Sequence, residues 1–457
     1  MPVLVAGVDS STQSTKVVLC EAETGKVVAQ AAAPHPSGTS CPPEAWWTAL
    51  SRAGKDLLER AAAVAVAGQQ HGMVVVDDEG EVVRNALLWN DTRSAPHARS
   101  LITELGGPAA WARTTGSVPT ASFTVTKLRW LAEHEPANAA RTAAVLLPHD
   151  WLTWKLGSAG YVTDRGDASG TGYYSPADGT WLPTHLEAAF GRTARLPRVA
   201  APGAAVGETP WGAILAPGTG DNMGAALGLG LRPGDVAVSL GTSGTAFTVS
   251  ENGSVDPSGA VAGFADATGR FLPLVCTMNA ARVLTAATSL LGTDLHGLSA
   301  LALSAPPGAE GLTLLPYLDG ERTPNRPDAN GVLRGLTSSN ATRANLARAA
   351  VEGMLAGLAE AVNHLGGTPQ RVILIGGAAS NEAVRLIAPE VFGVPVTVPR
   401  AAEYVALGAA RQAAWALTGD LPDWAAAPGE TFSGTSQPVI RQQYRTLRDE
   451  TEKWSAQ

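Results

Sequence analysis

The chain has 457 residues, of which 45% are hydrophobic and 16% are charged, and its formal net charge at pH 7 is -8. This composition excludes a disordered chain and is typical of a protein with large buried cores. The negative charge also argues against a nucleic-acid partner, because contacts to phosphates need a basic face. The length favours two or three domains.

Three cysteines, Cys20, Cys41 and Cys276, lie far apart along the chain. An odd number of separated cysteines indicates free thiols in a reducing compartment, not a set of disulfides. The chain begins with an apolar pattern and has no basic region before it, so we expect no signal peptide. No apolar run approaches the roughly 20 residues that a membrane helix needs. These features predict a cytoplasmic protein without a membrane partner.

Three short apolar runs open the chain, at residues 3–8, 16–20 and 26–31, and tight turns join them. Such runs predict the strands of an antiparallel meander. The first turn is polar and rich in hydroxyls, with Asp9 at its start and Lys16 at its end. This turn is the first candidate for binding a ligand.

The opening pattern returns at residues 235–249, where a small, hydroxyl-rich turn again separates two apolar runs. A breaker cluster at residues 231–234 precedes it and marks a domain boundary. We therefore predict two similar domains, residues 1–233 and residues 234–457, each with a sheet that begins with a hairpin.

The second half also holds a strong helical pattern at residues 342–365, and Gly366 and Gly367 follow it as a C-cap. Residues 371–375, with the sequence RVILI, predict a buried strand that runs into a glycine pair. From Gln437 onward the chain is polar and charged, and we expect a surface segment there.

The two hydroxyl-rich turns suit a phosphate ligand, because small residues leave backbone N–H groups free to bind anions. Asp9 could hold a hydrated Mg²⁺ ion, and Lys16 could neutralise phosphate as a point charge. Two such turns, one in each half, would hold a nucleoside triphosphate from both sides. The alternative is a pair of ordinary hairpins that bind nothing. The chain has neither a Walker loop nor the protein-kinase motifs, so ATP binding requires a different architecture.

Asp221 is flanked by glycines and followed by alanine and leucine, which favour a helix. This pattern places the carboxylate at a turn that leads into a helix N-terminus. There it could accept a proton from a substrate hydroxyl as a general base, and the helix dipole would help to keep it ionised. The alternative is that Asp221 simply caps the helix.

Two further polar segments lie about 20 residues apart. GQQHG carries Gln70 and His71, and LWNDTRS carries Trp89 and Asp91. Amides, an imidazole, an indole face and a carboxylate are the groups that bind a polyhydroxylated sugar. A single histidine such as His71 is more often a structural residue, but the two clusters together favour a polar substrate pocket.

The chain resembles the FGGY family of carbohydrate kinases along its whole length. GVDSSTQSTK resembles the first phosphate hairpin of the family, and GQQHG and LWNDTRS resemble the sugar side of its xylulose-phosphorylating members. Residues 122–134 and 331–352 fit the two family signatures. The segments GTGDNMGAA, SLGTSGT and LIGGAASN complete the set in family order.

The resemblance implies an α/β fold of the actin-like ATPase type, with two ribonuclease-H-like domains around a central cleft. It implies ATP- and Mg²⁺-dependent phosphorylation of D-xylulose to D-xylulose 5-phosphate in pentose catabolism, by a cytoplasmic enzyme that could form a homodimer. Asp221 matches the general base. The sugar-binding positions match Gln70, His71, Trp89, Asp91 and Asn222. The ATP-binding positions match Asp9 (also the metal position), Ser11, Thr12, Gln13, Ser14, Lys16, Gly241, Thr242, Ser243, Gly376, Gly377, Ala378 and Asn381.

Two positions depart from the usual family pattern. Ser11 stands where the family usually has glycine, and a side chain there would restrict a turn that needs positive φ. Gln70 stands where many bacterial relatives have methionine, which could alter the sugar preference. Kinases of ribulose, gluconate or a related sugar or polyol, and a non-kinase actin-like ATPase, stay open as alternatives. A non-catalytic sugar sensor would be expected to have lost Asp9 or Asp221, and both are present.

Overall fold

The structure is a computed structural model that describes residues 2–424 and 429–454. Its internal contacts divide the chain into two compact units, and each is described by itself. Unit 1 comprises Met1–Leu231, Ser250–Pro273 and Ala402–Ala426, and unit 2 comprises Arg232–Val249, Leu274–Ala401 and Ala427–Gln457. Among the described residues, no helix is both long and apolar enough to cross a membrane.

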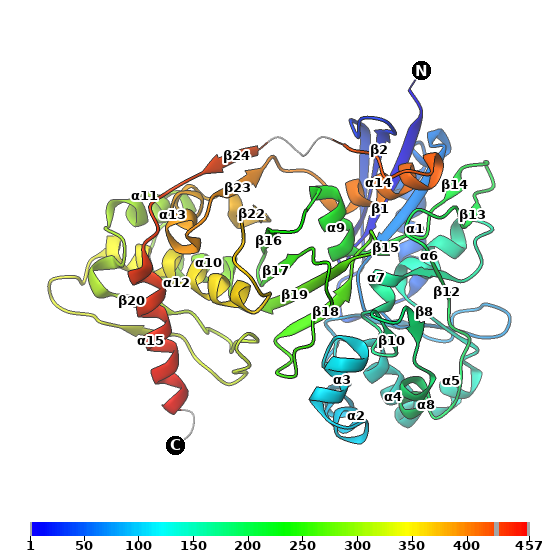
Figure 1. The fold of residues 1–457 in the computed structure, drawn as a ribbon, viewed down its shortest axis with the longest axis horizontal. Coiled ribbons are helices and arrows are strands. Elements are labelled where there is room, and N and C mark those ends of the chain that lie inside the picture. The colour runs from blue at the N-terminus through cyan, green and yellow to red at the C-terminus, as the bar shows by residue number, and fades with distance from the viewer. Residues whose placement is uncertain (1, 425–428, 455–457) are drawn as a thin grey trace. The chain divides into compact units, whose positions relative to one another are not determined.

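Unit 1 is built on a seven-stranded sheet with the order β13-β14-β5-β1-β2-β3, and β15 also pairs with β5 (Figure 1). The strands β1, β2 and β3 form the predicted antiparallel meander, and β5 runs parallel to β1. The bounds of these strands are β1 (Leu4–Ser10), β2 (Ser14–Glu21), β3 (Val27–Pro34), β5 (Ala63–Gly68), β13 (Gly207–Glu208), β14 (Ile214–Leu215) and β15 (Thr219–Gly220).

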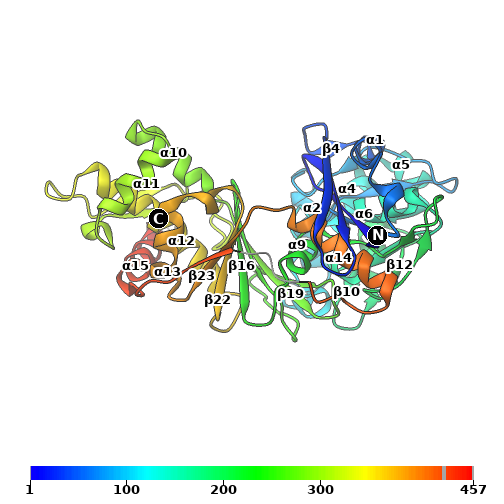
Figure 2. The same cartoon turned by 90° about the horizontal axis from the view of Figure 1, so that it is seen from above.

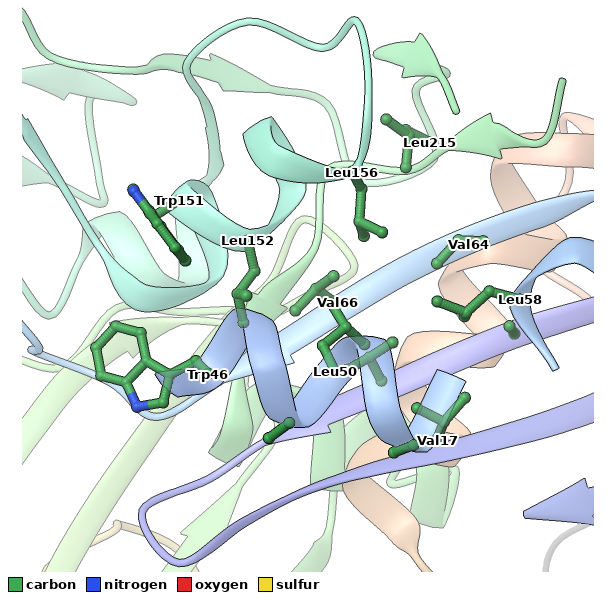
Figure 3. Close-up of a cluster of buried hydrophobic side chains, with 14 of the residues drawn as sticks. Val17, Trp46, Leu50, Leu58, Val64, Val66, Trp151, Leu152, Leu156 and Leu215 are labelled. Carbon is green, nitrogen blue, oxygen red and sulfur yellow. The ribbon is translucent and has the colours of Figure 1, made fainter. Parts of the chain in front are cut away.

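Both faces of this sheet are covered, which explains why its central strands read as nearly continuous apolar runs. On one face, α1 (Pro43–Gly54) and α6 (Pro148–Leu156) bring Trp46 and Trp151 into the core. Figure 3 shows the two tryptophans on one side of this cluster, with Leu152 between them and Val66 of β5. The other face packs against α14 (Tyr404–Thr418), which lies far along the chain but belongs to unit 1.

Glycines allow α14 to lie directly on the sheet and on α9 (Asp221–Leu229). A Cβ atom at Gly7 of β1 would lie 1.9 Å from the carbonyl oxygen of Ala406, and one at Gly408 would lie 1.8 Å from that of Gly224. Real Cβ atoms do not approach so closely, so only glycine fits at these two positions. This packing fixes α9, and with it the position of Asp221.

Other elements of unit 1 surround this core. Its remaining helices are α2 (Ala95–Glu104), α3 (Pro108–Thr115), α4 (Thr124–His134), α5 (Pro136–Arg141), α7 (Arg165–Ala168), α8 (Pro183–Phe190) and the 3-10 helix η1 (Leu58–Arg60). Its remaining strands are β4 (Ser40–Cys41), β6 (Val74–Val76), β7 (Ala86–Leu87), β8 (Ala144–Leu146), β9 (Val162–Asp164), β10 (Tyr174–Ser175), β11 (Thr180–Trp181), β12 (Arg198–Ala200) and β18 (Val261–Ala265).

Unit 2 repeats the pairing of unit 1. β16 is antiparallel to β17 and parallel to β22, as β1 is antiparallel to β2 and parallel to β5. This repeat confirms that the second half also begins with a hairpin. Within unit 2 the strand order is β19-β17-β16-β22-β23-β24, with bounds β16 (Asp235–Leu240), β17 (Gly244–Thr248), β19 (Phe271–Thr277), β22 (Arg371–Ile375), β23 (Val396–Pro399) and β24 (Gly429–Phe432).

The predicted long helix is α12 (Arg343–Asn363), with Thr342 as its N-cap. It contacts α10 (Ala281–Leu291), α11 (Leu295–Ser304) and α13 (Glu382–Phe392) (Figure 2). The smaller elements of unit 2 are β20 (Thr313–Leu315), β21 (Val332–Arg334), η2 (Ala309–Gly311) and η3 (Gly377–Ser380).

The prediction of a simple surface segment after Gln437 was incomplete. The tail forms α15 (Pro438–Trp454), whose apolar side chains at residues 440, 444 and 447 are buried while most of its charged groups face outward. The hydroxyl of Tyr444 donates to that of Tyr317 over 3.3 Å. The helical spacing of residues 440, 444 and 447 indicates an amphipathic helix, but the high charge of the tail obscured this pattern.

Candidate active site

The first hairpin turns tightly after Asp9. Both the backbone N–H and the hydroxyl of Ser11 donate to the carbonyl of Ser14, over 3.1 and 3.2 Å. Among the described residues, positive φ values outside glycine occur at His71, Ala309 and Glu310, so Ser11 has an ordinary backbone conformation. The turn therefore accommodates serine without strain, and the hydroxyl helps to close it.

Asp9 is buried at the end of β1. Burial raises the pKa of its carboxyl group to about 7; the charge of Lys16 partly offsets this effect, and that of Glu403 adds to it. Its Oδ1 atom is buried and has no hydrogen-bond partner among the described residues. An unpartnered carboxylate oxygen is the kind of ligand that Mg²⁺ prefers, so Asp9 fits the predicted metal position.

Lys16 lies opposite Asp9 in the register of β1 and β2. Its ammonium group forms an ion pair with Glu403, with 2.6 Å between Nζ and Oε2. Both side chains are about one-third exposed, at 33% and 34%, so Lys16 stays accessible to solvent. The sequence did not predict Glu403, because a pairing across 387 positions leaves no local signal.

Asp221 is the first residue of α9, and Gly220 occupies the N-cap position without a side-chain hydrogen bond. The capping alternative for Asp221 is therefore wrong. Its Oδ1 atom accepts hydrogen bonds from the backbone N–H of Asn222 over 2.8 Å and from the side-chain amide of Asn222 over 3.0 Å. These two bonds hold the carboxylate in one orientation.

The electrostatic surroundings of Asp221 differ from the expectation. The helix dipole was expected to keep the group ionised, but burial, followed by the charges of Asp9 and Asp167, raises its pKa to about 7. Burial has the larger effect, because removing a carboxylate from water destabilises its charged form by more than the helix dipole stabilises it. A carboxylate with a pKa near 7 suits general-base catalysis at neutral pH.

Gln70 and Asn222 form one network with Asp221. The side-chain amide of Asn222 donates to Oε1 of Gln70 over 2.9 Å as well as to Asp221. The Nε2 atom of Gln70 is buried and has no hydrogen-bond partner among the described residues. A buried donor without an acceptor is costly, so this amide is a natural contact for a ligand hydroxyl.

His71 has a φ of 68°, which a residue with a side chain rarely adopts. Its Nδ1 atom lies 2.6 Å from the carbonyl oxygen of Gly170, and because a carbonyl only accepts, Nδ1 carries a proton. The imidazole packs against Phe123 and Phe264, with ring centroids 4.7 and 5.7 Å away. Strained backbone of this kind occurs most often at functional sites, which favours a binding role for His71.

Lys127 holds this strained turn in place. Its fully buried ammonium group donates to the carbonyl oxygen of His71 over 2.7 Å and also to that of Ser122. Thr124 donates to the same His71 oxygen over 3.2 Å. Burial lowers the pKa of Lys127 to about 7, although the charge of Asp91 opposes this shift. Lys127 lies within the first family signature, residues 122–134, but its role could not be predicted from that pattern.

Trp89 and Asp91 lie on the same segment, but their side chains have different hydrogen-bond partners. The indole N–H of Trp89 donates to the hydroxyl of Thr12 over 2.8 Å, so the predicted sugar-side segment touches the first hairpin. Both oxygens of Asp91 already accept hydrogen bonds, from Thr39 and Arg93, each over 2.8 Å. Burial alone would raise the pKa of Asp91, but these bonds lower it below its usual value. Asp91 therefore orders this segment, and its contact with a sugar stays a prediction.

A buried histidine surrounded by carboxylates lies within unit 1 and was not predicted. The Nδ1 atom of His149 lies 2.6 Å from Oδ2 of Asp167, and its Nε2 atom lies 3.2 Å from Oδ1 of Asp150. Burial alone would lower the pKa of His149, but the carboxylates raise it to about 9. The His149 and Asp167 pair matters to the site because the charge of Asp167 helps to raise the pKa of Asp221.

Unit 2 contains a cavity of about 700 Å³ that several predicted ATP-binding residues line. They are Gly241, Thr242, Gly377, Ala378 and Asn381. A Cβ atom at Gly377 would meet nothing within 4 Å, so the backbone there is open to a ligand. Ser243 and Gly376 lie outside the lining. Gly376 has a φ of 89°, and a Cβ atom there would lie 2.8 Å from the carbonyl oxygen of Leu240.

Asn381 has a structural task beside the cavity. Its Oδ1 atom caps α13 by accepting from the backbone N–H of Val384 over 3.2 Å, and it also accepts from the hydroxyl of Ser299 over 2.8 Å. The structure thus brings the predicted residues together in two groups, one within each unit. That the two groups form opposite walls of one cleft stays a prediction.

Known proteins match this chain along nearly its full length. The model of the N-terminal domain of the FGGY family of carbohydrate kinases matches residues 4–228, and that of the C-terminal domain matches residues 236–417. The chain belongs to the FGGY family of carbohydrate kinases. It is therefore an ATP-dependent sugar kinase, with the predicted two-domain α/β fold of the actin-like ATPase type.

Individual relatives of this FGGY kinase are xylulose kinases. The xylulose kinase of Streptomyces coelicolor is 48% identical over 456 residues, which cover 96% of this chain and 92% of that protein. The xylulose kinase of Streptomyces rubiginosus is 47% identical and covers 97% and 94%. The crystal structure of xylulose kinase from Bifidobacterium adolescentis matches with a TM-score of 0.92 at 44% identity, covering 98% of this chain and 99% of that one.

Proposed function

We propose that this FGGY kinase transfers the γ-phosphoryl group of ATP to the terminal hydroxyl of D-xylulose and forms D-xylulose 5-phosphate. The observation that carries the proposal is the network within unit 1. There, the partly buried carboxylate of Asp221, the amides of Asn222 and Gln70 and the strained turn at His71 form one polar group. The names of the two Streptomyces relatives support D-xylulose as the sugar.

Asp221 acts as the general base. Both of its hydrogen bonds from Asn222 fall on Oδ1, so we assign Oδ2 to proton transfer. As the sugar hydroxyl attacks the γ-phosphorus, its proton moves to Oδ2, the new oxygen–phosphorus bond forms, and the bond to ADP breaks. A pKa of about 7 leaves a substantial fraction of Asp221 ionised at neutral pH and still makes it basic enough to take the proton.

The sugar is bound by Gln70, His71, Trp89, Asp91 and Asn222. The unpartnered Nε2 atom of Gln70 donates to a sugar hydroxyl, which satisfies a buried group that otherwise has no acceptor among the described residues. Trp89 is 43% exposed and offers an indole face to the apolar side of the sugar. The replacement of the common methionine by Gln70 therefore adds a donor to the pocket.

ATP is bound by both hairpins and the cavity of unit 2. The hydroxyls and backbone N–H groups of residues 11–14 and 241–243 contact the phosphates, and Lys16 adds positive charge. The adenosine lies in the cavity against Gly377 and Ala378. Asp9 would hold Mg²⁺ through its unpartnered Oδ1 atom, and the ion would supply positive charge to the phosphates. Three free cysteines favour a reducing compartment, so the proposal includes a cytoplasmic location.

Replacing Asp221 with asparagine tests this function most simply. Asp221→Asn keeps the shape and removes the base, so kcat for xylulose-dependent ADP release should fall by about 1,000-fold or more. ATP binding, measured by calorimetry, should stay within about twofold. Asp56→Asn, on an exposed residue, is the matched control. Retention of more than a tenth of wild-type kcat in Asp221→Asn would refute the assignment.

A substrate panel separates D-xylulose from the alternatives. Ribulose, gluconate and related sugars or polyols should give at least about tenfold lower kcat/KM than D-xylulose, because a site built on hydrogen bonds rejects a misplaced hydroxyl. A preference for another sugar would contradict D-xylulose as the substrate and would identify the chain as a kinase of that sugar within the family. ATP turnover that no sugar stimulates would favour the non-kinase ATPase instead.

A further inference from the structure

A cluster of three metal-binding side chains lies in unit 1 among residues that have no part in the proposed sugar or ATP site. His97 comes from α2, and Glu133 and His134 end α4. Each offers one ligand atom, and these atoms all lie within 4.8 Å of one another. The Nδ1 atom of His97 is 3.5 Å from Oε2 of Glu133. The two helices pack against each other, so the cluster bridges them.

We propose that His97, Glu133 and His134 form a binding site for a divalent transition-metal ion such as Zn²⁺. Two imidazoles and one carboxylate are a ligand set that zinc accepts in proteins, whereas Mg²⁺ prefers oxygen ligands alone. Metal–ligand bonds of about 2.0–2.1 Å place tetrahedral ligands about 3.3 Å apart. The side chain of Glu133 is exposed, so it can rotate to close the remaining distance.

Contacts around the cluster prepare both histidines to act as ligands. The Nδ1 atom of His134 lies 3.1 Å from the carbonyl oxygen of Trp130. A carbonyl only accepts, so Nδ1 carries the proton and Nε2 keeps the lone pair that binds a metal. Such a backbone partner orients histidine ligands in many metal sites. Burial lowers the pKa of His97, which favours the neutral form that a metal requires.

Arg129 is a nearby cation that opposes metal binding. Its Nη1 atom lies 3.7 Å from Oε1 of Glu133, but its Nη2 atom donates to Glu104 and to the carbonyl of Ala188, each over 2.6 Å. Glu104 balances the charge of Arg129, which leaves the charge of Glu133 available to a cation. The other oxygen of Glu133, Oε2, is the one that faces His97.

Zinc titration of the full-length protein, without an affinity tag and freed of metal with EDTA, tests the site. Calorimetry should show saturable binding that His134→Ala weakens at least tenfold. His364→Ala, on an exposed histidine of unit 2, is the matched control and should change nothing. Equal affinity in wild type and His134→Ala, an equal loss in His364→Ala, or no saturable binding would each overturn the proposal.

Thermal unfolding gives a second reading that does not depend on sugar kinase activity. Zinc should raise the unfolding temperature of the wild type, because a ligand that binds only the folded state stabilises it. His134→Ala should unfold at the wild-type temperature in EDTA and lose the rise with zinc. A rise with zinc that is the same in both proteins would place the ion elsewhere and overturn the proposal.

Trp130 provides an optical test of position. Its indole stacks on the imidazole of His134, with centroids 5.3 Å apart and planes 9° from parallel. Copper bound at the cluster should quench this indole, so Trp130→Phe should lose part of the copper-dependent quenching and keep its zinc affinity. Unchanged quenching in Trp130→Phe would contradict the proposed position.

Discussion

The sugar-side network of unit 1 and the cavity of unit 2 are built in different ways. The network and its surroundings contain ionisable groups with shifted pKa values, Asp221 and Lys127, and a strained turn at His71, and Asp9 of the neighbouring hairpin also has a raised pKa. The cavity is lined mostly by small, apolar or backbone groups. The side chain of Asn381, which also lines it, caps α13. The difference indicates that the first region performs chemistry and the second provides binding. Changes in the first should alter kcat, and changes in the second should alter the KM for ATP.

After Asp221, the largest expected effect of a substitution in unit 1 is at Asp9. Asp9→Asn removes the proposed metal ligand but keeps its shape, so kcat should fall by about 100-fold or more. Calcium or manganese in place of magnesium should change the activity of the wild type more than that of the variant. Steady-state kinetics at saturating ATP measure both effects. A variant that keeps wild-type kcat would remove Asp9 from the chemistry.

The pH dependence tests the same region without a substitution. Asp221 must be ionised to accept a proton, and its pKa is raised to about 7. The ionised fraction therefore falls as the pH decreases through 7, and kcat/KM for the sugar should fall about tenfold per pH unit below it. Asp221 and Asp9 also bind protons more tightly in the folded state, so they reduce folding stability as the pH rises from about 4 to 7. A flat rate profile between pH 5 and 8 would contradict the assigned base.

Filling the cavity of unit 2 should separate binding from chemistry. A side chain at Gly377 enters open space, so Gly377→Val should fold normally and occupy the place of the nucleotide. The KM for ATP should rise about tenfold while kcat stays within about twofold. Ala300→Val, on an exposed position of α11, controls for the added methyl groups. A loss of kcat with unchanged KM would show that the division between the two regions is wrong.

The smallest expected kinetic effect is at Lys127, which acts only through the turn at His71. Lys127→Met removes the ammonium group that donates to the carbonyl oxygens of His71 and Ser122, so the free energy of unfolding should fall by about 1–3 kcal/mol. The KM for the sugar should rise several-fold, with little change in kcat. Chemical denaturation and kinetics measure the two quantities, and Lys55→Met on an exposed residue is the control. An unchanged KM for the sugar would mean that Lys127 does not position His71.

Much of this arrangement could be predicted from local sequence. The strands of both hairpins follow from apolar runs that turns interrupt, and Asp221 was placed at a helix N-terminus by the glycine before it and the helix formers after it. The contacts that tune the site could not be predicted, because they join distant positions. The bond from Lys127 to His71 spans 56 positions, and that from Lys16 to Glu403 spans 387. The positive φ of His71 also has no local signal, since the same sequence fits an ordinary turn.

A crystal structure with D-xylulose and a non-hydrolysable ATP analogue would test the central claim most directly. The account predicts that Oδ2 of Asp221 lies within about 3.2 Å of the terminal hydroxyl of the sugar, on the side opposite the γ-phosphate. A sugar hydroxyl that points away from Asp221, or a sugar bound outside the group formed by Gln70, His71 and Asn222, would contradict it.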